Sequence, residues 1–120
     1  MTTPVVLITD IDLPGTDTDD ALTAAGLQVH RSLAEASAEL RGEVAALMVQ
    51  WEQITASVMD SMPKLQFISR LGIGCDMIDL SAASERGIVV ANTPTYCVEE
   101  VASHTMAMIL SMSRGLVHYD

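Results

Sequence analysis

The feature that most limits the possible folds of this sequence is a repeated alternation between short strand-like runs and segments with helix signals. Most of the runs are predominantly apolar and lack the regular polar alternation of a half-exposed strand, which is typical of strands covered on both faces. Strands that alternate with helices favour an α/β fold with a parallel, doubly wound sheet. We expect five strands in the flavodoxin-like order, at 5–9, 28–30, 44–49, 65–69 and 88–91.

Helix signals separate these strands. The first expected helix begins at Asp17 or Thr18 and ends at Gly26, and acidic residues in its first turn suit the helix dipole. The others are a small amphipathic helix with Leu33, Ala36 and Leu40 on one face that ends before Gly42, a helix carrying Ile54, Val58 and Met62 that Pro63 ends, and a helix from Leu80 to Arg86 capped by Asp79.

The last segment, from about Val98 to Gly115, has helical spacing but is apolar nearly all round. A helix of this kind at the edge of a small domain needs a covering surface, so we expect a partner that is either further chain or another subunit. No Gly or Pro stop signal stands right at the end of the sequence, as expected if the natural chain continues.

Sixteen acidic side chains against six basic ones give a formal net charge of -10, which opposes nucleic-acid phosphates and anionic lipid surfaces. We therefore expect no nucleic-acid partner. No apolar run approaches a membrane span, and the start of the chain lacks a secretory signal. Two cysteines, Cys75 and Cys97, make no disulfide framework, so a cytoplasmic location is expected.

The loop at 70–76 is the strongest candidate for a ligand site. Gly72 and Gly74 can take positive φ and let a ligand approach the main chain, whose N–H groups favour a small anion. Arg70 could hold a single carboxylate beside them. The dinucleotide pattern G-x-G-x-x-G fails because Met77 occupies the third glycine position. A glycine turn that merely lets the strand reverse remains the alternative.

In a sheet of this type ligands lie at the carboxyl ends of the strands, so the candidate loops are 10–16, 50–52, 71–76 and 92–97. Trp51 and Tyr96 each follow a strand end, which places two amphipathic rings beside the glycine turn unless they pack in the core. The acidic residues between Asp10 and Asp20 are better explained as a solvated loop with helix-capping acids than as a cation site or a phosphoacceptor pocket.

The remaining chemistry-bearing side chains indicate no further site. Three histidines lack metal-ligand spacing, and His104 is interpreted as a packed or domain-facing polar group. No neighbouring base is evident for either cysteine, so a nucleophilic role is not expected.

Four stretches resemble the N-terminal part of the D-isomer-specific 2-hydroxyacid dehydrogenases. They are 65–79 (LQFISRLGIGCDMID), 82–88 (AASERGI), 92–94 (NTP) and 99–102 (EEVA). The opening, from Ile8 to Pro14, is similar to the branch related to phosphoglycerate dehydrogenases and the C-terminal binding protein corepressors. The departures are Met77, where the family usually has asparagine, and Ser103, where it usually has an acid.

This resemblance implies a two-domain, NAD-dependent enzyme in which residues 1–97 form the flavodoxin-like substrate domain. Residues 98–120 would be the interdomain helix that leads to a Rossmann domain beyond this chain. By family analogy, the amides of Ile73 and Gly74 bind the substrate carboxylate with help from Arg70, and Val101 contacts the nicotinamide. Trp51 and Tyr96 complete the expected substrate contacts.

The resemblance further implies a small 2-hydroxy or 2-oxo acid as substrate and a homodimer as the complete enzyme. The family's catalytic arginine, glutamate and histidine lie beyond position 120, so these residues alone should be inactive. Two alternatives remain open: an NAD(H)-sensing binding module of the corepressor type, and a free-standing flavodoxin-like domain that covers its last helix by self-association. The identity of the acid and the choice between NAD and NADP are also open.

Overall fold

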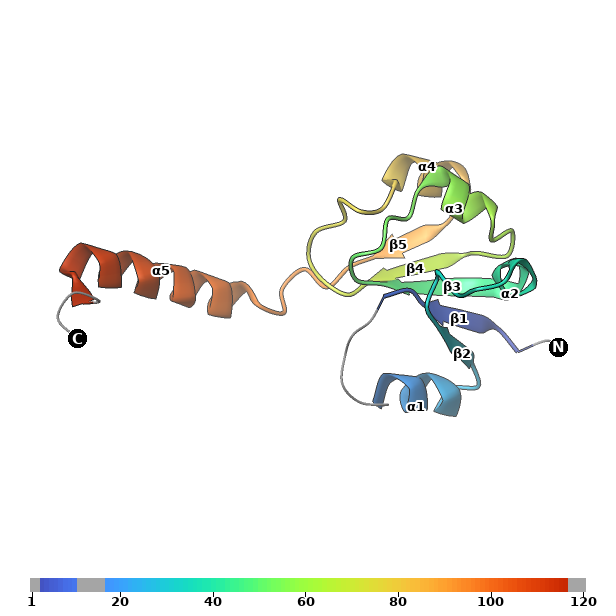
Figure 1. The fold of residues 1–120 in the computed structure, drawn as a ribbon, viewed down its shortest axis with the longest axis horizontal. Helices are drawn as coiled ribbons and strands as arrows, with labels where there is room; N and C mark the ends of the chain where they lie inside the picture. Colours follow the sequence, from blue (N-terminus) through green and yellow to red (C-terminus); the bar gives the residue numbers. More distant parts are fainter. Residues whose placement is uncertain (1–2, 11–16, 117–120) are drawn as a thin grey trace.

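The computed structural model describes residues 3–10 and 17–116. Within them, five parallel strands form one sheet in the order β2-β1-β3-β4-β5 (Figure 1). Their bounds are β1 Val5–Ile8, β2 Gln28–Arg31, β3 Val44–Val49, β4 Phe67–Arg70 and β5 Val89–Ala91. The predicted fold class and strand order are confirmed.

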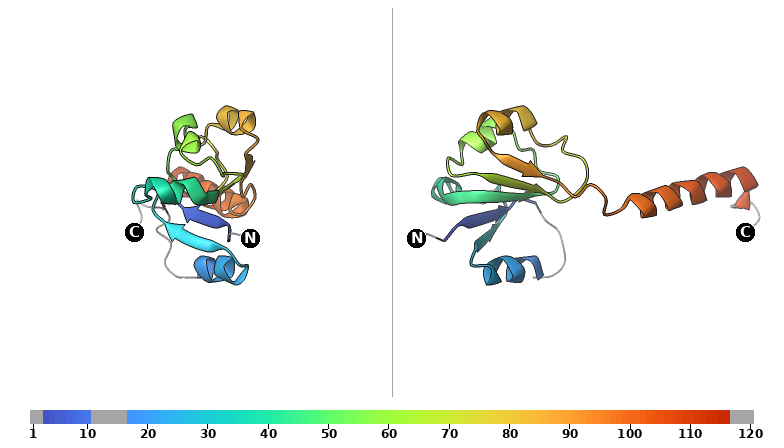
Figure 2. Two further views of the ribbon diagram at one scale, coloured as in Figure 1. Left: turned by 90° about the vertical axis from the view of Figure 1, so that its right-hand side faces the viewer. Right: turned by 180° about the vertical axis from the view of Figure 1, so that it is seen from behind.

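Helices connect the strands and lie on both sides of the sheet. The bounds are α1 Asp17–Ala24, α2 Ala38–Glu43, α3 Ala56–Asp60, α4 Leu80–Glu85 and α5 Val98–Arg114. Figure 2 shows α1 on one side of the sheet and α3 with α4 on the other. Asp79 caps α4 as expected, since its carboxylate accepts the N–H of Ala82 at 2.9 Å.

The core lies where the central strands meet α3 and α4. Leu7, Leu47 and Ile68, one from each of the three central strands, are fully buried. Burying one such side chain stabilises the fold by about 1.5–3 kcal/mol, so this layer holds the strand ends and their loops in place.

The predicted amphipathic helix with Leu33, Ala36 and Leu40 on one face is wrong in extent. Ser32 takes φ 71° and Leu33 is buried in a turn, so the chain does not yet follow a helical path. The helix begins only after Ser37, whose hydroxyl accepts the N–H of Leu40 at 3.2 Å. It then runs through Gly42 and gives way directly to β3.

The helix expected around Ile54, Val58 and Met62 is also shorter than predicted. Thr55 caps α3, and Ile54 lies before it in a parallel bridge to Ile78. The backbone of Ile54 is therefore used to tie the loop after β3 to the loop after β4.

The last helix, α5, projects away from the sheet, as Figures 1 and 2 show. None of its residues is buried, and Gly115 ends it in the left-handed conformation at φ 63°. Its exposed apolar residues include Val98, Val101, Met106, Met108, Ile109, Leu110 and Met112. His104 is likewise exposed rather than packed against the described residues. Among the described helices, none is long and apolar enough to cross a membrane.

Candidate functional site

The carboxyl ends of β1, β3, β4 and β5 bring together the loops that the sequence singled out. This edge of the sheet faces the side from which α5 leaves the domain (Figure 1). The loops at 50–52, 71–76 and 92–97 are all described there, whereas only Asp10 of the expected loop at 10–16 lies within the described residues.

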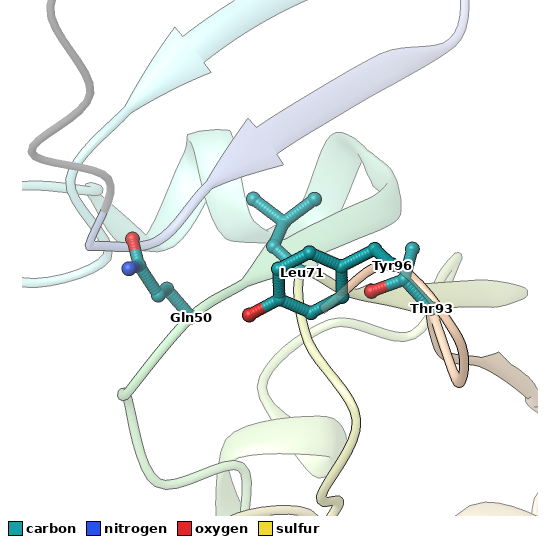
Figure 3. Close-up of a pocket in the computed structure, with 4 residues that line it drawn as sticks. All are labelled: Gln50, Leu71, Thr93 and Tyr96. Carbon is teal, nitrogen blue, oxygen red and sulfur yellow. The ribbon is translucent and has the colours of Figure 1, made fainter. Parts of the chain in front are cut away.

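A cavity of about 320 Å³ opens at this edge between the loops after β3, β4 and β5 (Figure 3). Gln50, Leu71, Thr93 and Tyr96 line it. The phenol oxygen of Tyr96 lies on the side of the ring that faces Gln50. Trp51 is 68% exposed and Tyr96 67%, so core packing is the wrong account of both rings.

The loop at 71–76, called the glycine loop below, lies beside this cavity. Three of its consecutive carbonyl groups accept hydrogen bonds that hold it in place. The backbone N–H of Thr93 donates to the Gly72 oxygen at 3.0 Å, and the Asn92 side-chain amide donates to the Ile73 oxygen at 2.8 Å. Nε of Arg70 donates to the Gly74 oxygen, also at 2.8 Å. Donors from β4 and from the segment after β5 therefore fix three successive peptide planes.

Fixing the carbonyls also fixes the amides. In a trans peptide the C=O of one residue and the N–H of the next point in opposite directions, so the N–H groups of Ile73, Gly74 and Cys75 point away from those three donors. None of these N–H groups donates to an acceptor within 3–10 or 17–116. Ile73 and Gly74 are exposed, which leaves their amides available to an anion.

The prediction of positive φ at Gly72 and Gly74 is wrong. In the described part of the chain, the glycines with positive φ are Gly26, Gly87 and Gly115. At Gly72 the requirement is space, because a Cβ there would lie 2.6 Å from Nη1 and 2.8 Å from Cζ of Arg70. The absent side chain makes room for a guanidinium, which the sequence alone did not reveal.

Arg70 is 6% exposed, an uncommon burial for a charged side chain. Its Cζ lies 5.7 Å from the centre of the Trp51 ring, a cation–π distance. Nη1 is buried and has no hydrogen-bond partner within the described residues. A buried cation with an unused donor beside outward-pointing amides is suited to binding a carboxylate.

Asp10 has a structural role that sequence reasoning missed. Its carboxylate accepts the backbone N–H groups of Gln50, at 2.9 Å, of Trp51 and of Glu52, together with the Thr9 hydroxyl at 2.8 Å. Partial burial raises the pKa of Asp10, but these hydrogen bonds outweigh it and leave the pKa below its ordinary value of 3.8. A solvated loop is therefore the wrong interpretation of Asp10.

A signal for this role exists in the sequence. Asp10 is the second residue after β1, and Gln50 directly follows the neighbouring β3, so parallel pairing brings the two ends together. Of the other acids in that stretch, Asp19 forms an ion pair with Arg31 at 2.8 Å. Among the described residues, no group of three possible metal ligands is found.

Of the other expected site residues, Tyr96 lines the cavity and Val101 does not. A hydrogen bond with Cys97 raises the pKa of the Tyr96 phenol, and the nearby charge of Arg70 opposes that rise. Cys75 and Cys97 are free, partly buried thiols. Val101 lies on α5, is 59% exposed and is not among the residues that line the cavity.

Comparison with known proteins gives concordant results. The family model described as D-isomer specific 2-hydroxyacid dehydrogenase, catalytic domain, matches residues 6–115. A D-3-phosphoglycerate dehydrogenase of Mycobacterium tuberculosis is 34% identical over 126 residues, an alignment that covers 100% of the chain. The chain spans 23% of the length of that relative.

Two solved structures contain a domain with a fold similar to that of this chain. A 2-hydroxyacid dehydrogenase from Ketogulonicigenium vulgare has a TM-score of 0.79 and 33% identity, over 99% of this chain and 38% of the other. A D-lactate dehydrogenase from Aquifex aeolicus, complexed with NAD and lactic acid, has a TM-score of 0.74 and 27% identity, over 89% of this chain and 33% of the other.

Proposed function

Because this chain belongs to the D-isomer specific 2-hydroxyacid dehydrogenase family, we propose that it supplies the substrate domain of an NAD-dependent oxidoreductase. The reaction is hydride transfer between nicotinamide and C2 of a small D-2-hydroxy acid, or its reverse from the 2-oxo acid. The chain covers less than half of each relative described above, which supports a second, cofactor-binding domain in the complete enzyme.

The observation that carries this proposal is the pairing of outward amides with a buried guanidinium. The N–H groups of Ile73 and Gly74 and the unpartnered Nη1 of Arg70 offer donors for the oxygens of one carboxylate. Because hydrogen bonds hold the carbonyls of the loop, its amides need little rearrangement when the acid binds, whereas the buried Nη1 of Arg70 would reach the carboxylate through a shift of the guanidinium.

The walls of the cavity would then orient the rest of the substrate. With the carboxylate on the glycine loop, the remaining part of the acid would lie against Tyr96 and Leu71, with Trp51 stacked over Arg70 outside it. A volume of about 320 Å³ suits a small acid. The exposed aromatic rings would exclude water from the reacting carbon once a second domain covers them.

In this proposal α5 is the crossing to that second domain. Its exposed apolar residues need a covering surface, and Val101 would meet the nicotinamide there. Nicotinamide supplies and accepts the hydride when bound, and the groups that move the hydroxyl proton would also come from outside residues 1–120. The complete enzyme would be a homodimer in the cytoplasm, a reducing compartment that suits two free cysteines.

The direct test is reduction of small 2-oxo acids by the complete enzyme. We expect NADH absorbance to fall when glyoxylate, pyruvate or hydroxypyruvate is added, and chiral products to be the D-enantiomers. Residues 1–120 alone should show no turnover. If the complete protein binds NADH tightly but reduces none of these acids, the cofactor-sensing function is the better account.

A further inference from the structure

The number of basic and acidic side chains near the cavity affects which acids could bind there. Of the six basic residues in the chain, only Arg70 lies beside the glycine loop. The others are engaged elsewhere or distant: Arg31 pairs with Asp19, Lys64 with Glu43 and Arg86 with Asp60, Arg41 donates to the carbonyls of Leu33 and Ala36, and Arg114 lies in the last turn of α5.

Acidic groups, by contrast, gather near the cavity. The charged carboxylate of Asp10 lies behind the Gln50 backbone, and Glu52 and Asp76 are exposed on the neighbouring loops. A second hollow of about 440 Å³ shares Tyr96 with the first, and both Glu99 and Glu100 line it. A negative group that extends from the cavity would therefore meet like charges on several sides.

The described residues that line the cavity carry no charge. Gln50, Leu71, Thr93 and Tyr96 offer an amide, a hydroxyl, a phenol and an apolar surface. Arg70 can neutralise one carboxylate, whereas a phosphate group adds about -1.5 to -2 at neutral pH and needs cations or several further donors. Gln50 is the one long, unbranched and flexible side chain among the described residues of this lining, and Arg or Lys would keep that shape, so position 50 is where such a cation could reach the substrate.

We infer that this site takes 2-oxo acids with a single negative charge, and that the neutral side chain of Gln50 excludes acids carrying a phosphate or a second carboxylate at C3. This inference rests on the proposed function and narrows its substrate class. In its substrate this chain would differ from the mycobacterial relative, whose name, D-3-phosphoglycerate dehydrogenase, specifies a phosphorylated acid.

The test uses two acids that differ only in the phosphate, hydroxypyruvate and 3-phosphohydroxypyruvate, with the complete enzyme and NADH. We expect kcat/KM to be at least about tenfold higher for hydroxypyruvate. Gln50→Arg should shift the ratio of the two kcat/KM values by about tenfold or more toward the phosphorylated acid. Gln50→Lys, with the same charge on a different side chain, provides a second variant should the first fold poorly.

The matched control is Gln53→Arg. Gln53 is exposed on the same loop and does not line the cavity, so the same added charge should change the ratio by less than about twofold. A wild-type enzyme that uses the phosphorylated acid equally well would overturn the inference while the proposed function stands. If Gln53→Arg shifts the ratio of the two kcat/KM values as much as Gln50→Arg does, Gln50 is not the residue that sets the preference. Failure to reduce these two acids and also glyoxylate and pyruvate would instead reject the proposed function.

Discussion

Nε of Arg70 donates a hydrogen bond of 2.8 Å to the carbonyl oxygen of Gly74, four residues further along the chain. The last side chain of β4 thus folds back over its own loop and passes through the space that Gly72 leaves open. One residue therefore both shapes the loop and brings a positive charge to it.

Removing the guanidinium tests this double role. Arg70→Ala in the complete enzyme should raise KM for the 2-oxo acid by about tenfold or more, because a charge-assisted contact to the carboxylate is lost. The loop should also loosen, since the Gly74 carbonyl loses its donor. Steady-state kinetics measure KM, with the Kd for NADH as the control. An unaltered KM would show that the amides act alone.

A methyl group at position 72 should disturb the packing of the Arg70 guanidinium on its loop while leaving the positive charge of Arg70 in place. We expect Gly72→Ala to lower the free energy of unfolding by about 1–3 kcal/mol, because its Cβ would overlap the buried guanidinium. Gly42→Ala is the matched control. Its Cβ meets nothing within 4 Å and it lies inside α2, so it should stabilise the protein by about 0.5–1 kcal/mol. Chemical denaturation compares the two, and equal effects would contradict the close packing.

Blocking the amides tests the binding surface itself. Gly74→Val places a branched side chain where a carboxylate would approach, so turnover should fall by about a hundredfold or more while NADH binding persists. The Cβ would also come within 3.2 Å of the Asp76 carboxylate, which makes Gly74→Ala a useful milder variant. Retained turnover in Gly74→Val would remove this loop from the site.

The carboxylate of Asp10 should make stability depend on pH. Its folded-state pKa lies below the ordinary value, so its contribution is present above the unfolded-state pKa and is lost as the pH falls through the folded-state pKa. Asp10→Asn should cost roughly 1 kcal/mol at neutral pH, and the difference from wild type should shrink as the pH drops below about 4. Thermal unfolding from pH 7 to pH 3 measures this, and the exposed Glu35→Gln serves as a control. A constant difference would show that the carboxylate charge is not involved.

The strand pattern and helix stops allowed most of the fold to be predicted. Short apolar runs carry a strong signal, and Gly26 and Gly87 end their helices through positive φ, as their positions suggested. The error around Leu33 arose because its apolar spacing matches a helix while the residue is in fact buried in a turn. Apolar periodicity reports burial, and burial alone does not distinguish a turn from a helix.

The site was predictable at the level of loops and not at the level of contacts. The glycines at 72 and 74 identified the loop, but the sequence suggested backbone freedom where the structure shows space for Arg70. Asp10 was overlooked because its partners are main-chain amides about forty residues away, which carry no residue-specific signal, so that only the pairing of β1 with β3 indicates them.

The three donors that anchor the glycine loop have a consequence for how the protein is made. Two of them, from Asn92 and Thr93, are synthesised about twenty residues after the loop that they hold. On the ribosome, the loop can reach its final shape only after β5 has emerged and taken its place at the edge of the sheet. The nascent chain thus completes the proposed carboxylate-binding loop late, when the last strand of the domain is in place.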